Sequence, residues 1–341
     1  MARPARALDD IAAEAIPFAA LIAAGEPAIL RGVARDWPIV AAARRSTAEA
    51  IGSLKRFEGD RPVTAYTGAP EIGGRFFYDA TLTGLNFTAA RVKLGDVLDR
   101  IAAGSGAAAA DAPALYIGST DLDLYLPGFR AENDLPLGPI AAHAPLASIW
   151  IGNRTVAAAH YDISNNIACC VAGRRRFTLF PPDQIANLYP GPLEPTPGGQ
   201  VVSMVDPAAP DLARYPGYRD ALAAAVVAEL EPGDALIYPA LWWHQVEALC
   251  DFNILVNYWW NDAPAHADNP QASLLHALLS LRDRPAAEKA AWHALFDYYV
   301  FGAGERAGAH LPDQARGALA APLDPAAARR LRAQILNRLN R

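Results

Sequence analysis

The 341-residue sequence predicts a mainly β protein, a barrel or sandwich with flanking helices and a helical C-terminal region. Two observations predict this fold. Residues 115–260 contain short apolar runs separated by Pro, Gly and Asn, which is typical of many short strands joined by turns. Beyond Pro264 the apolar residues recur at the spacing of an α-helix. A β domain followed by helices is therefore expected.

This change in the spacing of apolar residues divides the chain into a β domain over residues 1–265 and a helical region over residues 266–341. The β domain consists of an N-terminal α/β elaboration and a core over residues 115–260. Within the elaboration, residues 28–33 are expected to form a strand. The Ala-rich residues 105–112 are low in complexity and predict a surface connection.

The last helix is expected to begin with Asp324 as its N-cap and Pro325 in its first turn. It carries an apolar stripe of four residues, namely Ala328, Leu331, Ile335 and Leu339. Such a stripe can pack on its own domain, or against the same helix of a second subunit. The second alternative predicts a homodimer formed through the C-terminal helices.

The composition is that of a folded protein, with 52% apolar and 19% charged residues. Lys and Arg total 30 against 36 Asp and Glu, so a net charge of −6 gives no electrostatic reason to expect a nucleic-acid partner. The net charge does not exclude a local basic groove on the surface. Cys169, Cys170 and Cys250 match no zinc-binding spacing and are expected to be buried thiols in a reducing compartment.

No stretch of the sequence has the length and apolarity of a secretory leader or a membrane span. We therefore expect a cytoplasmic protein with no membrane partner.

The most informative motif is His160-Tyr161-Asp162. On a strand, residues two apart point to the same face, so the imidazole and the carboxylate would aim at one point. They supply two thirds of the two-histidine, one-carboxylate set that holds Fe(II) and leaves positions free for other ligands. A motif of this length also occurs by chance, so a third ligand is required.

His244 is the candidate for that third ligand. It follows a tight turn at Pro232-Gly-Asp, a short apolar strand over residues 235–238, and Pro239, which interrupts strand pairing. A histidine beside Trp242 and Trp243 is costly to bury unless its nitrogens have partners. Hydrogen bonding in the core would satisfy it, but the upstream motif favours a metal. The other five histidines have no such context.

Three polar residues in apolar strands are candidates for binding a cosubstrate. In the run Arg174 to Phe180, alternation places Arg175 on the apolar, inward face, where a guanidinium needs an anion such as a dicarboxylate. Arg174 and Arg176 are expected on the exposed face. Asn166 and Asn257 could orient metal ligands or cosubstrate, or could be core hydrogen-bonding groups.

Four segments together resemble the JmjC/cupin-8 (cupin-like) family of Fe(II)- and 2-oxoglutarate-dependent oxygenases. They are His160-Tyr-Asp, Gly173-Arg-Arg-Arg-Phe-Thr-Leu-Phe-Pro-Pro182, Leu188-Tyr-Pro, and the run from Pro232-Gly-Asp to His244. The resemblance is closest to asparaginyl hydroxylases of that family and is strongest over residues 149–260. It implies a double-stranded β-helix, or jelly roll, with helices outside.

The resemblance implies that His160, Asp162 and His244 bind Fe(II), and that O2 and 2-oxoglutarate are cosubstrates. Arg175 then stands where the hydroxylases have a lysine that binds 2-oxoglutarate, and Ala157 stands where they have a threonine. Tyr116 resembles a tyrosine that contacts the far carboxylate of 2-oxoglutarate. Asn166 and Asn257 fall on active-site asparagines.

The implied reaction is hydroxylation of a C–H bond in a protein, peptide or small molecule, with succinate and CO2 as coproducts. Demethylation by the same chemistry remains open. Two rival hypotheses are a cupin-like module that binds a metal or ligand without turnover, and a zinc hydrolase or isomerase. No general base or acid with hydrolase-like spacing supports the latter.

Overall fold

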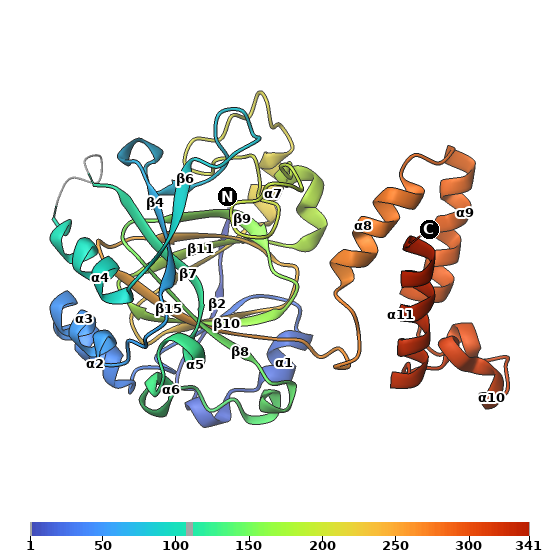
Figure 1. Cartoon of the computed structure of the whole chain (residues 1–341), viewed down its shortest axis with the longest axis horizontal. Coiled ribbons are helices and arrows are strands. Elements are labelled where there is room, and N and C mark those ends of the chain that lie inside the picture. The colour runs from blue at the N-terminus through green and yellow to red at the C-terminus, as the bar shows by residue number, and fades with distance from the viewer. Residues whose placement is uncertain (1, 107–111, 341) are drawn as a thin grey trace. The chain divides into compact units, whose positions relative to one another are not determined.

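The computed structural model describes residues 2–106 and 112–340. It divides into two compact units, Met1–Asn261 and Asp262–Arg341. The first unit contains two stacked sheets of nine and six strands with helices around them (Figure 1). Most of the Ala-rich connection expected at residues 105–112 lies outside the described residues.

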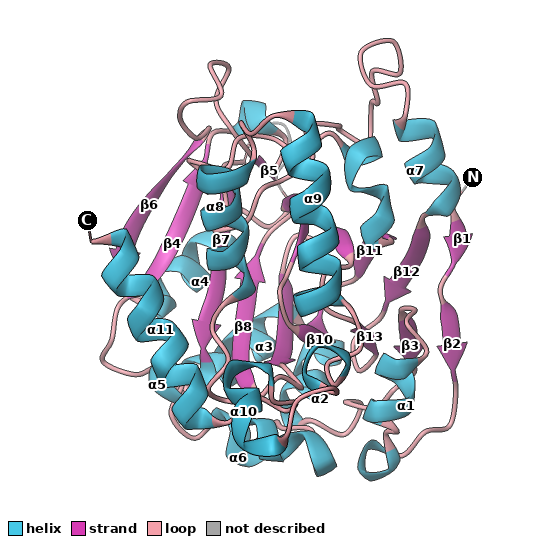
Figure 2. Cartoon of the chain, turned by 90° about the vertical axis from the view of Figure 1, so that its right-hand side faces the viewer, coloured by secondary structure: helices cyan, strands magenta, loops and turns pink. Residues whose placement is uncertain are grey.

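Figure 2 shows the strands of the larger sheet side by side, from β6 and β4 at one edge to β3 and β2 at the other. In order, they are β2 (Arg6–Leu8), β3 (Ala28–Leu30), β13 (Ala235–Tyr238), β10 (Asn165–Ala172), β15 (Asn253–Trp260), β8 (Leu146–Gly152), β7 (Ala114–Asp121), β4 (Val63–Gly68) and β6 (Phe87–Val92). The strand expected at residues 28–33 is thus present as β3 but ends at Leu30, because a left-handed turn begins at Gly32.

The smaller sheet contains the strand that carries Arg175. In order, its strands are β1 (Arg3–Pro4), β12 (Val226–Leu230), β11 (Arg175–Phe180), β14 (Trp243–Ala248), β9 (Val156–Tyr161) and β5 (Arg75–Phe76). The four strands from β12 to β9 pair antiparallel, whereas β1 and β5 add at the two edges in parallel.

Helices cover the outer faces of both sheets. Those of the first unit are α1 (Phe18–Ala23), α2 (Pro38–Arg45), α3 (Thr47–Lys55), α4 (Leu94–Ala103), α5 (Leu122–Tyr125), α6 (Phe129–Glu132) and α7 (Tyr218–Ala224). The apolar side chains of α1 to α6 form one core with the outer face of the nine-stranded sheet. Helix α7 instead packs with Phe180 and Trp243 of the six-stranded sheet.

Strand β10 explains why the two sheets stack. Its residues are all buried, and alternation divides them between two cores. Ile167, Cys169 and Val171 point to the helices, whereas Ala168 and Cys170 point to the six-stranded sheet. A strand with two apolar faces must be covered on both sides. The result is a jelly-roll sandwich with flanking helices, as predicted.

The second unit is helical. It consists of α8 (Pro270–Leu281), α9 (Ala286–Phe296) with a π-helical turn at Asp297–Phe301, α10 (Asp313–Arg316) and α11 (Pro325–Leu339). The predicted N-cap of α11 is confirmed, because the Asp324 carboxylate accepts hydrogen bonds from the backbone N–H groups of Ala326 and Ala327 at 2.8 and 3.0 Å. The apolar stripe is buried at Ala328 but half exposed at Ile335 and Leu339.

The cysteines differ partly from expectation. Cys169 and Cys170 are buried free thiols, but Cys250 is only partly buried because it lies in the turn between β14 and β15. No helix among the described residues combines the length and apolarity needed to cross a membrane. The cytoplasmic location stays a prediction.

Candidate functional site

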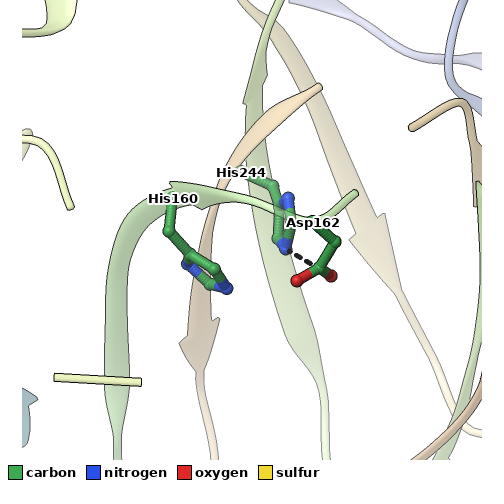
Figure 3. Close-up of side chains that lie close together, drawn as sticks. All are labelled: His160, Asp162 and His244. Atoms are coloured by element: carbon green, nitrogen blue, oxygen red, sulfur yellow. Dashed lines mark ion pairs between the residues drawn. The ribbon is translucent and has the colours of Figure 1, made fainter. Parts of the chain in front are cut away.

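Two adjacent strands bring His160, Asp162 and His244 together. His160 and His244 are register partners in the antiparallel pair β9–β14, and Asp162 follows the end of β9. One ligand atom from each side chain lies within 4.8 Å of the others, and the side chains converge on a common point (Figure 3). This is the one cluster of three potential metal ligands of these types within residues 2–106 and 112–340.

Backbone hydrogen bonds orient both imidazoles. His160 Nδ1 lies 2.8 Å from the carbonyl oxygen of Ala158, and His244 Nδ1 lies 3.0 Å from that of Trp242. A carbonyl oxygen can only accept, so each Nδ1 carries the proton and each Nε2 keeps a free lone pair. Both rings therefore present the tautomer that a metal ion requires at Nε2.

The carboxylate of Asp162 is held from the other sheet. The indole of Trp259 donates to Asp162 Oδ2 at 3.0 Å, and His244 Nε2 lies 3.6 Å from the same oxygen. The backbone also contributes, because the N–H of Leu241 donates to the carbonyl of Asp162 at 2.8 Å. Leu241 has a left-handed φ of 68°, a costly conformation that brings the strand carrying His244 back to Asp162.

Burial lowers the pKa of His244 from 6.5 to about 4. The neighbouring His160 also contributes to this lowering, whereas Asp162 and the hydrogen bond to Trp242 partly oppose it. His244 is therefore neutral at physiological pH and needs to lose no proton before it binds a metal.

The triad lies in the wall of a cavity of about 510 Å³ between the two sheets. Asn166, Asn257 and Arg175 also line this cavity, as does Tyr116. The structure thus brings every site residue singled out from the sequence to one place. Much of the remaining wall is aromatic, formed by Tyr66, Phe76, Phe87, Trp150, Phe177, Tyr238 and Trp259.

Arg175 lies on the inward face of β11 and is 3% exposed, whereas Arg174 is exposed and Arg176 forms an ion pair with Glu229. Its Nε and Nη2 atoms are buried and have no hydrogen-bond partner among the described residues. Burial lowers the pKa of Arg175, and Tyr116 partly opposes this effect. An arginine remains charged even so. A buried guanidinium with two free donors fits an anion with two oxygens, such as a carboxylate.

Tyr116 lies on β7 and its ring stacks on that of Trp150, with 6.1 Å between the ring centroids. Burial raises its pKa above the ordinary value of 10, and the charge of Arg175 partly opposes the shift. The Tyr116 hydroxyl and the Arg175 guanidinium therefore interact electrostatically in the cavity that both line. Gly118 permits this packing, because a Cβ there would lie 3.1 Å from the Tyr116 ring and 3.3 Å from the Trp150 ring.

The two asparagines belong to a chain of hydrogen bonds that the sequence did not reveal. Trp150 donates to Asn257 Oδ1 at 2.7 Å, Asn257 donates to Asn166 Oδ1 at 3.2 Å, and Asn166 donates to the hydroxyl of Tyr238 at 2.7 Å. Burial raises the pKa of Tyr238 well above 10. Sequence reasoning missed Trp150, Tyr238 and Trp259, although Tyr238 lies in the run that leads to His244 and Trp259 lies in the strand that carries Asn257.

The donor set fits a divalent transition metal. Two imidazoles whose rings are oriented through Nδ1 and one carboxylate are ligands suited to Fe(II), and such a facial set leaves coordination positions open. The unpaired guanidinium of Arg175, in the same cavity, fits the far carboxylate of a dicarboxylate bound beside that metal.

The sequence model of the Cupin-like domain family matches residues 13–266. HSPB1-associated protein 1 of Homo sapiens is 34% identical over 139 residues, which are 40% of this chain and 25% of that protein. Lysine-specific demethylase JMJ31 of Arabidopsis thaliana is 33% identical over 115 residues, or 32% of this chain and 20% of that protein. The tRNA wybutosine-synthesizing protein 5 of Danio rerio is 29% identical over 145 residues, which are 42% of this chain and 39% of that protein. The chain thus matches well under half the length of each of these relatives.

Proposed function

Because the chain belongs to the Cupin-like domain family (JmjC type), we propose that it is an Fe(II)- and 2-oxoglutarate-dependent dioxygenase. It hydroxylates a C–H bond of a protein, peptide or small molecule and forms succinate and CO2. One observation carries the proposal. A buried guanidinium with two unpaired donors shares a cavity with a two-histidine, one-carboxylate triad.

His160, Asp162 and His244 would hold the iron through Nε2, a carboxylate oxygen and Nε2. When bound, Fe(II) supplies the activation of O2 that couples oxidation of 2-oxoglutarate to succinate and CO2 with transfer of one oxygen atom to the substrate. The chain contributes the fixed tautomers of both imidazoles and the Trp259 hydrogen bond that orients the carboxylate.

Strand register supports Arg175 as the residue that binds the far carboxylate of 2-oxoglutarate. His244 pairs with Leu179, and Arg175 lies four residues further along β11, opposite Ala248. At about 3.4 Å per residue the separation along the strand is about 14 Å. The long arginine side chain takes up part of this length, which leaves room for a small dicarboxylate. Tyr116 would add a hydroxyl donor at the same end.

The charges in the cavity support an uncharged substrate group. Asp162 and Arg175 are the acidic and basic side chains that line it. With Fe(II) and the 2-oxoglutarate dianion bound, the positive and negative charges would balance. A substrate cation or anion would then be desolvated with no counter-charge, which is costly. We therefore favour hydroxylation of a neutral group over demethylation of a methylated lysine.

Substrates named in the relatives' descriptions set the alternatives to be tested. One relative is described as a lysine-specific demethylase and another as a tRNA wybutosine-synthesizing protein. The net charge of −6 still favours a partner other than nucleic acid, and that expectation stays a prediction.

Turnover of 2-oxoglutarate tests the function. The protein is purified without oxygen, loaded with Fe(II), and assayed for succinate release with pools of neutral peptides, methyl-lysine peptides and tRNA. We expect release that His160→Ala abolishes and that exposed His293→Ala, the matched control in α9, leaves unchanged. Metal binding without binding or decarboxylation of 2-oxoglutarate would instead indicate a non-catalytic module.

A further inference from the structure

The hydrogen-bond chain beside the triad has a fixed direction. It begins at the indole N–H of Trp150, which can only donate, so the atom of Asn257 that it contacts must be the acceptor Oδ1. Asn257 then donates through Nδ2 to Asn166 Oδ1, and Asn166 donates through its own Nδ2 to Tyr238. The donor-only indole thereby sets the orientation of both amides, which their shape alone leaves ambiguous.

The series of hydrogen bonds ends at the hydroxyl of Tyr238, whose own hydrogen takes part in no hydrogen bond among the described residues. Tyr238 accepts from Asn166 at 2.7 Å, so its own O–H must point elsewhere. Among the hydrogen bonds of the described residues, none uses this hydrogen. Tyr238 is 2% exposed, and a buried donor without an acceptor is costly. Because Tyr238 also lines the cavity that holds the triad and Arg175, a molecule bound in that cavity can supply the acceptor.

The position of Tyr238 identifies that molecule. Its ring centroid lies 5.0 Å from that of His244 and 6.4 Å from that of Phe177. Phe177 separates Leu179, the strand partner of His244, from Arg175 along β11. Tyr238 therefore flanks the part of the cavity between the metal ligands and the guanidinium. A dicarboxylate that spans these two points passes beside its ring.

We infer that Tyr238 binds the cosubstrate, its hydroxyl donating a hydrogen bond to an oxygen atom at the end of 2-oxoglutarate nearest His244. This inference rests on the proposed function. Arg175 neutralises one end of the dianion, and the chain from Trp150 through the two asparagines presents a single aligned donor toward the other end. Neutral side chains do this without adding a charge beside the metal ligands.

Binding measurements on the metal-loaded protein test the inference. Titration calorimetry without oxygen gives the Kd of 2-oxoglutarate for the Fe(II) form of the wild type and of Tyr238→Phe. A hydrogen bond to an anionic acceptor is lost, so we expect Kd to rise about tenfold or more. The visible charge-transfer absorption of the Fe(II)–2-oxoglutarate complex should also shift, because its oxygen ligands lose a donor.

Tyr218→Phe is the matched control. Tyr218 is 1% exposed, and its hydroxyl is buried and has no partner among the described residues, but it belongs to α7, which packs on the outer side of the six-stranded sheet. Its replacement should change neither Kd nor the absorption. Equal Kd values and spectra for the wild type and Tyr238→Phe would overturn the inference and leave the function intact. Absence of 2-oxoglutarate binding to the iron-loaded wild type would overturn both.

Discussion

Trp259 and Asp162 are joined across the two sheets of the sandwich by a hydrogen bond of 3.0 Å from the indole N–H to the carboxylate Oδ2. They are 97 residues apart in the sequence. Trp259 lies near the end of β15 in the nine-stranded sheet, whereas Asp162 follows β9 in the other. A candidate metal ligand is thus oriented by a residue that does not itself bind the metal.

Replacing Trp259 by phenylalanine should weaken metal binding while keeping the aromatic packing. Loss of a group that orients a ligand typically lowers metal affinity by about 10- to 100-fold. Chelator competition with Fe(II) or Mn(II) measures this. Trp292→Phe in the helical unit, where the indole lies 3.4 Å from Glu288, is the control and should bind metal as the wild type does. Unchanged affinity in Trp259→Phe would show that the hydrogen bond has no orienting role.

Arg175→Met should abolish 2-oxoglutarate binding and leave the ligand-free protein as stable as the wild type or more so. The guanidinium is 3% exposed with two unpaired donors, so its removal relieves a desolvation cost of about 1 kcal/mol or more. Calorimetry gives the affinity and urea unfolding gives the stability. Arg176→Met, which removes only a surface ion pair with Glu229, should change neither strongly. Retained 2-oxoglutarate affinity in Arg175→Met would contradict the assignment.

The metal-free protein should lose stability as the pH falls from about 6.5 to about 4. Burial lowers the pKa of His244 from 6.5 to about 4 in the folded state. Between these values the unfolded chain binds more protons, so acidification favours unfolding. Urea unfolding at a series of pH values measures the slope. His244→Leu should flatten it, whereas exposed His293→Leu should not. An equal slope in the wild type and His244→Leu would refute this account.

The half-exposed apolar stripe of α11 predicts a homodimer. Ile335 and Leu339 of this stripe are each 50% exposed, and a helix face of this kind is stabilised when it is covered. Analytical ultracentrifugation should detect a dimer that Ile335→Glu together with Leu339→Glu converts to a monomer. Leu193→Glu, at a residue 50% exposed in the first unit, is the control. Monomers of both the wild type and a chain ending near Ala263 would rule out the dimer.

The sequence alone predicted the class of the fold and the pairing of His160 with Asp162 in the candidate metal site. Both depend on local periodicity: alternation identified the inward face of β11 that carries Arg175, and His160 and Asp162 lie two residues apart beside one strand. The N-cap at Asp324 was equally predictable, because capping depends on a few adjacent residues. In each case the physical cause lies within a few positions of the chain.

Only the tertiary structure decided which side chains meet across the sandwich. Alternation gives the face on which a residue lies but neither its neighbouring strand nor its register. The bond from Trp150 to Asn257 spans 107 residues, and that from Asn166 to Tyr238 spans 72. Such contacts depend on strand order, in which β13 and β15 flank β10. The triad could therefore be read from the sequence, whereas the donor at Tyr238 required the folded arrangement.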